Sequence, residues 1–224
     1  MNKVNPFLYQ NIDNSNHWII SEIVLNQCKQ HPKKKIIQFV DGPEWSFDDL
    51  KNIAFEKAKT LKNFSIKQGD TVTFMVDDPI DFIPYWVASS FLGVMFVALN
   101  TALKGSVLLH QIRLANSNVI IVSDVYYEDV VQLVQEKEFK IKVLNCSELK
   151  STGMILEKDV YHGKISDEVC TMFTSGTSGP SKGVLMPNAH CVLFAVGTIE
   201  NYKLNHNHIF YISLPLFHAN GLFM

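Results

Sequence analysis

Helix and strand patterns alternate along most of the 224-residue chain, and this alternation constrains its fold more than any other feature. Short runs rich in β-branched and aromatic residues are separated by longer amphipathic segments and by turn residues. Strands that alternate with helices build a mainly parallel sheet covered by those helices. We therefore expect an α/β fold, and the length allows one large domain, or one domain and a fragment of another. The expected strands are KIIQFVD (35–41), TVTFMV (71–76), VMFVAL (94–99), NVIIVS (118–123), KIKVLN (140–145), VCTMF (169–173) and IFYISL (209–214).

Amphipathic helices are expected between these strands. Ser46 and Asp49 form a capping-box pattern, with Asp in place of the usual Glu, and apolar residues then recur on one helical face as far as Leu61. The pattern weakens between residues 146 and 168, which we expect to form a surface connection. The expected helices cover residues 16–30, 46–63, the segment from Pro79, the segment from about Ser106, 127–136 and 190–201.

The apolar run from Phe82 to Leu103 permits a second interpretation, because it carries no charge and is about as long as a bilayer span. Pro84, Gly93 and several polar residues interrupt it. The β-rich VMFVAL after Gly93 also suits a buried strand that follows a helix. We expect a helix and a buried strand here, with no integral membrane segment. A membrane-associated protein is the alternative.

The amino-acid composition indicates which kinds of molecule the chain is expected to bind. Lys+Arg 20 against Asp+Glu 22 gives a formal net charge of −2, which argues against a broad electrostatic grip on nucleic acid or anionic lipid. The four cysteines are scattered, and His206 and His208 lack further spaced ligands, so we expect neither a metal site nor a disulfide framework. The first residues lack the pattern of a secretory signal. We expect a cytoplasmic protein whose partners are small molecules or proteins.

The segment TMFTSGTSGPSKGVLM, residues 171–186, places glycines and hydroxyl residues directly after an expected strand. Glycine lets the backbone approach a ligand and turn its N–H groups inward, hydroxyls add donors, and Lys182 adds a positive charge. These features are typical of a loop that wraps a polyphosphate, although a flexible surface turn is the ordinary explanation of a Gly/Ser-rich stretch. The candidate phosphate-binding residues are Thr174, Ser175, Gly176, Thr177, Ser178, Gly179 and Lys182.

Two better-known glycine motifs do not fit this loop. A Walker A loop requires glycine where Ser181 stands and Ser or Thr where Gly183 stands. A hydrolase elbow, G-x-S-x-G, requires glycine where Pro180 stands, so Ser178 is a poor candidate nucleophile. Cys170 adjoins the loop, but a buried strand cysteine is the default interpretation.

Residues 173–184 match the pattern Y/F-T-S-G-S/T-S/T-G-x-P-K-G-V at every position except Ser181, which replaces the proline before Lys182. The segment therefore resembles the phosphate-binding signature of the adenylate-forming (AMP-binding) superfamily, which includes acyl-CoA ligases, peptide-synthetase adenylation domains and insect luciferases. The missing proline bears on the rigidity of the loop, for which Pro180 can compensate.

Two further segments agree with this resemblance. FLGVMFVALNTALKGSVLLHQI (91–112) is similar to an early core stretch of the family, with Ala98 in place of a proline. SLPLFHANGL (213–222) looks like the segment that carries an aromatic residue or a histidine beside the acyl carboxylate, which gives that role to His218. The resemblance covers about residues 45–224. Asn100 and the LFH sequence favour acyl-CoA ligases, and the carnitine/crotonobetaine- or fatty-acyl-CoA ligase group is the nearest match.

The resemblance implies ATP-dependent activation of a carboxylic acid to an acyl-adenylate, followed by transfer to coenzyme A. It implies that residues 174–179 donate hydrogen bonds to the β- and γ-phosphates, that Lys182 neutralises charge, and that His218 positions the acyl group. Mg²⁺ accompanies ATP, with ligand residues outside this chain. Members of the family are longer, so residues 1–224 are expected to be an incomplete N-terminal AMP-binding domain that cannot complete the reaction alone.

Two alternatives stay open at this point. One is a truncated nucleotide-binding module that retains affinity for phosphate but performs no chemistry. The other is an adenylate-forming enzyme of a different branch, which activates an amino acid or an aryl acid.

Overall fold

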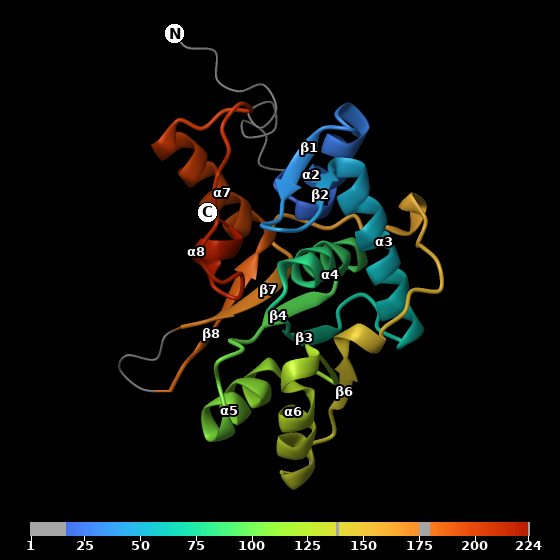
Figure 1. Ribbon diagram of the computed structural model, residues 1–224, viewed down its shortest axis with the longest axis vertical. Helices are drawn as coiled ribbons and strands as arrows, with labels where there is room; N and C mark the ends of the chain where they lie inside the picture. Colours follow the sequence, from blue (N-terminus) through green and yellow to red (C-terminus); the bar gives the residue numbers. More distant parts are fainter. Residues whose placement is uncertain (1–16, 138, 175–179, 224) are drawn as a thin grey trace.

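The computed structural model describes residues 17–137, 139–174 and 180–223, whose arrangement is shown in Figure 1. The strands are β1 (Lys35–Gln38), β2 (Glu44–Ser46), β3 (Thr71–Met75), β4 (Met95–Ala98), β5 (Val119–Val122), β6 (Lys142–Asn145), β7 (Glu168–Phe173) and β8 (Gly183–Pro187). The helices are α2 (Ile20–Gln30), α3 (Phe47–Asn63), α4 (Pro79–Leu92), α5 (Gly105–Ala115), α6 (Asp124–Glu136), α7 (Asn188–Tyr202) and α8 (Ala219–Leu222), with short 3-10 helices η2 (Cys146–Glu148) and η3 (Glu157–Asp159).

The main sheet of the described residues has the strand order β6-β5-β3-β4-β7-β8. Neighbouring strands run parallel except β8, which is antiparallel to β7. The predicted α/β fold with a mainly parallel sheet is therefore confirmed. A parallel sheet covered on both faces has strands that are apolar throughout, and β5 is buried at every position for this reason. β1 and β2 form a separate antiparallel pair.

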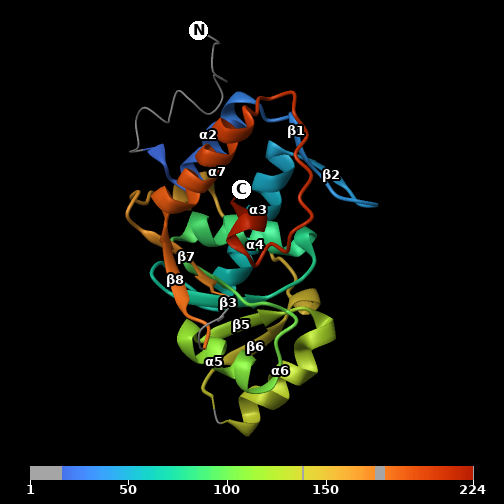
Figure 2. The same cartoon turned by 90° about the vertical axis from the view of Figure 1, so that its left-hand side faces the viewer.

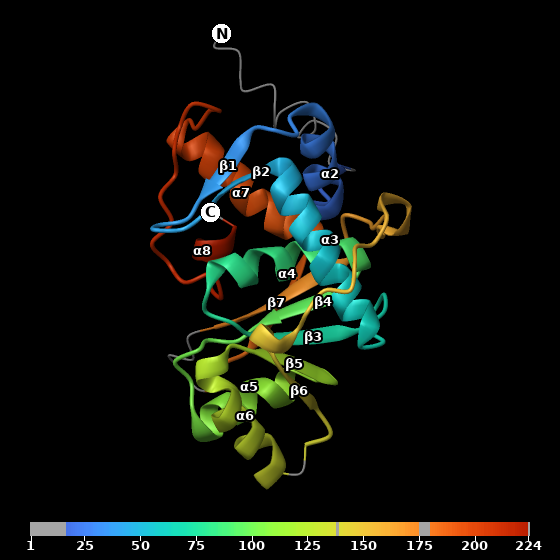
Figure 3. The ribbon, with the colours of Figure 1, turned by 45° about the vertical axis from the view of Figure 1, so that its right-hand side comes forward.

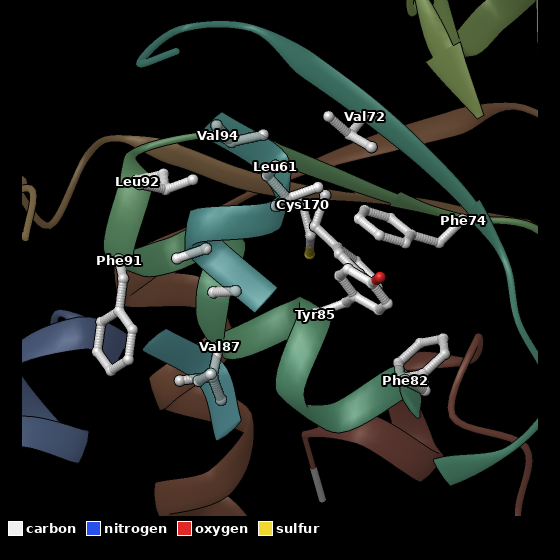
Figure 4. Packing of buried hydrophobic residues seen from close by; sticks show 14 of the residues in the cluster. Leu61, Val72, Phe74, Phe82, Tyr85, Val87, Phe91, Leu92, Val94 and Cys170 are labelled. Atoms are coloured by element: carbon white, nitrogen blue, oxygen red, sulfur yellow. The ribbon is translucent and has the colours of Figure 1, made fainter. Parts of the chain in front are cut away.

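Helices cover both faces of the sheet, with α3 and α4 on one side and α5 and α6 on the other (Figures 1 and 2). Side chains alternate between the faces along each strand. Phe74 of β3 stacks on Phe96 of β4 with ring centroids 4.3 Å apart, and Phe82 of α4 packs edge-on against Phe96 at 5.2 Å. Figure 4 shows Phe74 and Phe82 in this buried cluster. The next residue of β3, Met75, packs with Leu108 of α5 in the cluster on the opposite face.

The capping box expected before residue 47 is confirmed. The backbone N–H of Ser46 donates to Asp49 Oδ2 at 2.8 Å, and the N–H of Asp49 donates to Ser46 Oγ at 3.2 Å. A shorter Asp side chain therefore closes the box as well as Glu would. Helix α3 begins directly after this cap, and its buried face packs against α4.

The apolar run from Phe82 to Leu103 is divided between the end of α4, a glycine turn and β4, as the helix-and-strand interpretation predicts. Gly93 ends α4 in the left-handed region, at φ 64°. A side chain at this position would place its Cβ 2.6 Å from the ring of Tyr161, so only glycine fits without a shift. Among the residues that the structure describes, none of the helices is long and apolar enough to cross a bilayer.

The expected strands are wrong at three places. Glu44–Ser46 forms β2, where no strand is expected, through pairing with β1. Gly183–Pro187 forms β8, where again no strand is expected, because the chain turns back and pairs with β7. The strand expected over residues 209–214 is irregular and exposed, and Ile209 is 97% exposed. A strand needs a hydrogen-bonded neighbour, and within the described chain no strand pairs with this segment.

The connection between β6 and β7 is less superficial than expected. It runs alongside α3 and α4 (Figure 3), where the N–H of Ile155 donates to Phe55 O at 3.3 Å and the N–H of Tyr161 donates to Phe91 O at 2.7 Å. The side chain of Ile155 is buried, and so is that of Val160. The segment therefore closes the outer side of the helical layer.

Candidate functional site

The carboxyl ends of the parallel strands meet at one edge of the sheet, and the glycine-rich loop leaves β7 at this edge. Open α/β sheets bind ligands in the crevice outside these ends. A polar residue lies there in the last position of each parallel strand or within two positions after it. These residues are Asp77 after β3, Asn100 after β4, Ser123 after β5, Asn145 in the last position of β6, and Thr174 after β7.

The two ends of the loop are joined at a neck that continues the β7–β8 ladder. The N–H of Thr174 donates to Lys182 O at 3.0 Å, and the N–H of Lys182 donates to Thr174 Oγ1 at 3.1 Å. One step further into the ladder, Phe173 pairs with Gly183. The structure thus brings Thr174 and Lys182 together, both with exposed side chains. The remaining candidates, Ser175, Gly176, Thr177, Ser178 and Gly179, lie outside the described residues.

Helix α5 holds the second limb of the loop at Ser181, which sequence reasoning did not predict. His110 Nε2 lies 2.9 Å from the backbone oxygen of Ser181, and Gln111 Nε2 donates to Ser181 Oγ at 3.1 Å. Gln111 is 4% exposed, although it lies on a helix face that is otherwise apolar. Residues 110 and 181 are far apart in sequence, so no local pattern could have revealed this contact.

A second polar network at the same edge was also missed. Asp77 accepts hydrogen bonds from Ser123 Oγ at 2.8 Å and from the Tyr126 hydroxyl at 3.2 Å. The neighbouring Asp78 is not part of this network and instead caps α4 by accepting from the N–H of Ile80 at 2.8 Å. The sequence contains one indication of this network, which is that Asp77 and Ser123 each lie at, or directly after, the end of an expected strand.

His218 lies in a different segment from the loop. It is exposed and precedes α8, and its ring contacts Phe217 with centroids 4.7 Å apart. Phe223, which follows α8, packs against Trp86 of α4 at 5.9 Å, so this segment lies over the α4 face of the sheet. Among the described residues, no hydrogen bond or ring contact joins His218 to the neck of the loop.

Cys170, the cysteine beside the loop, is buried in an environment that disfavours its reactive thiolate form. Cys170 Sγ lies 3.9 Å from Cys191 Sγ, and both residues are buried. This hydrogen bond and burial in the core raise the pKa of the Cys170 thiol. Because the thiolate is the nucleophilic form, the arrangement gives Cys170 no role as a nucleophile.

A model of the AMP-binding enzyme family matches residues 24–224 of the chain. The chain belongs to the AMP-binding enzyme family. The predicted relationship to adenylate-forming enzymes is confirmed at that level, and the matched range includes the glycine-rich loop.

The chain is similar to AMP-binding enzymes of several kinds. It is 30% identical to a 2-succinylbenzoate–CoA ligase of Oceanobacillus iheyensis, over 92% of this chain and 41% of that protein. It is 24% identical to long-chain fatty acid transport protein 6 of Homo sapiens, over 88% of this chain and 34% of that protein. The chain therefore spans about two fifths or less of the length of these relatives.

Among solved structures, the fold is shared with o-succinylbenzoate coenzyme A synthetase of Bacillus subtilis in complex with ATP and magnesium ion. The TM-score is 0.78 at 22% identity, over 92% of this chain and 53% of that one. At this identity the similarity shows the fold of the AMP-binding family and not the substrate.

Proposed function

We propose that the chain is the N-terminal part of an AMP-forming acyl-CoA ligase and that the loop between β7 and β8 binds the phosphates of ATP. The observation that carries this proposal is the neck of the loop, where Thr174 and Lys182 are joined at the carboxyl edge of the sheet. A ligand placed against this neck would meet the Thr174 hydroxyl, which can still donate its hydrogen, and the exposed ammonium group of Lys182.

In this proposal the loop supplies donors from Thr174, Ser175, Gly176, Thr177, Ser178 and Gly179 to the β- and γ-phosphates. Each hydrogen bond to a charged acceptor contributes about 1.5–3 kcal/mol, so several are sufficient to hold a triphosphate. Lys182 offsets the negative charge of the phosphates. His218 is assigned to the acyl carboxylate, a role that its exposed position before α8 permits.

The reaction consists of two displacements. A carboxylate oxygen of the acid attacks the α-phosphorus of ATP, the bond to the β-phosphate breaks, and pyrophosphate leaves. The sulfur of coenzyme A then attacks the acyl carbon, and AMP leaves. The loop contributes to the first step by holding the departing pyrophosphate in line while charge develops on its oxygens.

Mg²⁺ is expected to accompany ATP, but the described part of this chain supplies no ligand set for it. Across residues 17–137, 139–174 and 180–223, no group of three or more Asp, Glu, His or Cys side chains is placed to hold a metal ion. We therefore assign no metal ligand to this chain and derive no step through the ion.

We further propose that residues 1–224 are an incomplete N-terminal AMP-binding domain. The coverage of the relatives supports this, since the chain spans 41% of the 2-succinylbenzoate–CoA ligase. The exposed segment 209–214 supports it as well. Five of its six residues carry large apolar or aromatic side chains, and each of these residues is about half exposed or more. The exposed fractions are 97% for Ile209, 49% for Phe210, 75% for Tyr211, 49% for Ile212 and 51% for Leu214. Such a run is normally covered by further protein.

The acid is a carboxylic acid of one of two kinds. A 2-succinylbenzoate-type aromatic acid is supported by the relative that is 30% identical. A fatty acid is supported by similarity to a long-chain fatty acid transport protein. A nucleotide-binding module without catalysis is the second candidate function, because the contacts at the neck of the loop account for phosphate binding alone.

Titration calorimetry of the 224-residue chain with ATP, tripolyphosphate and AMP tests the phosphate site. We expect ATP and tripolyphosphate to bind and Lys182→Ala to weaken both by about tenfold, because one charged donor is lost. Lys158→Ala removes an exposed lysine of η3 and is the matched control. Equal affinity of the Lys182→Ala and Lys158→Ala variants for ATP would show that the loop does not bind phosphate.

Pyrophosphate exchange tests whether the chain is an incomplete domain. The isolated chain is expected to bind ATP without exchanging labelled pyrophosphate into it, with either 2-succinylbenzoate or a fatty acid present. Rapid exchange with one of these acids would show that the chain carries a complete adenylation site and is not an incomplete domain.

A further inference from the structure

The contacts of Ser181 suggest a role for α5 that the phosphate-binding pattern does not contain. In that pattern a proline precedes the lysine, and its ring restricts the backbone of the loop. Ser181 stands at this position here, directly before Lys182. The backbone is freer at serine than at proline, so the unfolded chain has more conformations to lose. Some other interaction must therefore hold this limb of the loop in place.

The peptide unit between Ser181 and Lys182 is held on both sides. Its oxygen, Ser181 O, lies 2.9 Å from His110 Nε2, and its N–H donates to Thr174 Oγ1 at 3.1 Å. A carbonyl oxygen only accepts, so His110 Nε2 carries the hydrogen in this contact. Because a peptide unit is planar, bonds to both its oxygen and its nitrogen fix its orientation.

A third bond holds the side chain of Ser181. Gln111 Nε2 donates to Ser181 Oγ at 3.1 Å from a residue that is only 4% exposed. Among the described residues, nothing hydrogen-bonds to Gln111 Oε1, which is buried. A half-paired amide on an apolar helix face is unfavourable for stability compared with leucine. The presence of Gln111 at this position is explained if its hydrogen bond to Ser181 serves to hold the loop and not to stabilise the core.

We propose that His110 and Gln111 are positioning residues for the phosphate loop, which they anchor through Ser181 in place of the proline ring. This inference rests on the proposed function for its consequence in ATP binding. The anchoring itself is a property of the ligand-free chain. The line of contacts runs from α5 through Ser181 to the neck at Thr174 and Lys182.

Amide hydrogen exchange of the ligand-free chain tests the anchoring. Gln111→Leu keeps the size of the side chain and suits its apolar surroundings, so the variant is expected to fold. Exchange in the peptide that covers residues 181–185 should become about fivefold faster, the factor that corresponds to one net hydrogen bond. Exchange in β3 and β5 should not change. Gln132→Leu, the same replacement at an exposed site on α6, should leave both regions unaltered.

Rescue by proline separates positioning from a general loss of stability. In the Gln111→Leu background, Ser181→Pro restores the restriction that the pattern uses and needs no partner for its side chain. Ser181→Pro alone leaves the Gln111 amide without its partner and is expected to be less stable than the double variant. Restored protection of residues 182–185 in the double variant supports the proposal, and failure to restore it overturns the proposal.

Affinity for ATP is the second readout. Gln111→Leu and His110→Phe should each weaken ATP binding severalfold, and Ser181→Pro should restore it in the Gln111→Leu background. Faster exchange with unchanged ATP affinity would overturn the positioning role. If the wild-type chain binds no ATP, the proposed function is wrong, and the exchange measurements still decide whether α5 anchors the loop.

Discussion

Replacing Gly93 with alanine tests how the chain enters β4, the strand that leads to Asn100 at the carboxyl edge of the sheet. Gly93 has φ 64°, and an alanine in this left-handed region costs about 1–2 kcal/mol. The new Cβ would lie 2.6 Å from Tyr161 Cδ1, closer than side-chain atoms normally approach. The ring cannot move away easily, because its hydroxyl donates to Asp167 Oδ2 at 2.9 Å and the backbone N–H of Tyr161 donates to Phe91 O at 2.7 Å.

Overpacking of this kind costs about 1–3 kcal/mol, so the Gly93→Ala variant should lose about 2–5 kcal/mol of unfolding free energy in total. For a chain of this size that loss lowers Tm by about 4–20 °C. Urea denaturation followed by circular dichroism measures the first quantity, and a thermal scan measures the second.

Gly105→Ala is the matched control. Gly105 has φ 56°, and nothing lies within 4 Å of the position that its Cβ would occupy. The control should therefore show only the backbone cost of about 1–2 kcal/mol. Equal losses at the two glycines would refute the argument that contact with Tyr161 excludes a side chain at Gly93.

Three further predictions concern the neck of the loop, a helix cap and a buried thiol. Thr174→Val removes the acceptor of the Lys182 N–H, so ATP affinity should fall about fivefold while Thr174→Ser retains it, as calorimetry would show; equal affinities would contradict this. Ser46→Ala should cost about 1 kcal/mol in urea denaturation, because α3 loses its cap, and an unchanged midpoint would speak against it. Burial raises the pKa of the Cys146 thiol from 9.0 to about 12, so iodoacetamide should modify it at pH 8 only in unfolded protein. The folded state binds the Cys146 proton more tightly than the unfolded state does. This difference therefore contributes fully to the free energy of unfolding below pH 9, and the contribution is lost as the pH rises from 9 to 12. Rapid modification of native protein would disprove the burial argument.

The sequence was sufficient for the fold class because helix and strand periodicities are local. The alternation of apolar and polar residues placed α3 and its Ser46 cap, and the short β-branched runs placed β3, β4 and β5. Local patterns failed where pairing decides the structure. In β8 only Met186 is buried, so the segment shows no alternation and becomes a strand through pairing with β7. Residues 209–214 show the composition of a strand and find no partner among the described strands.

By itself the sequence determined the α/β class, the position of the glycine-rich loop after a strand, and the pattern that identifies the family. The tertiary structure alone decided the strand order, the pairing of Asp77 with Ser123, and the anchoring of Ser181 by Gln111. Ser181 and Gln111 are 70 residues apart in the chain. Whether two such side chains meet depends on how α5 packs on the sheet beside the loop, and no local periodicity contains that information.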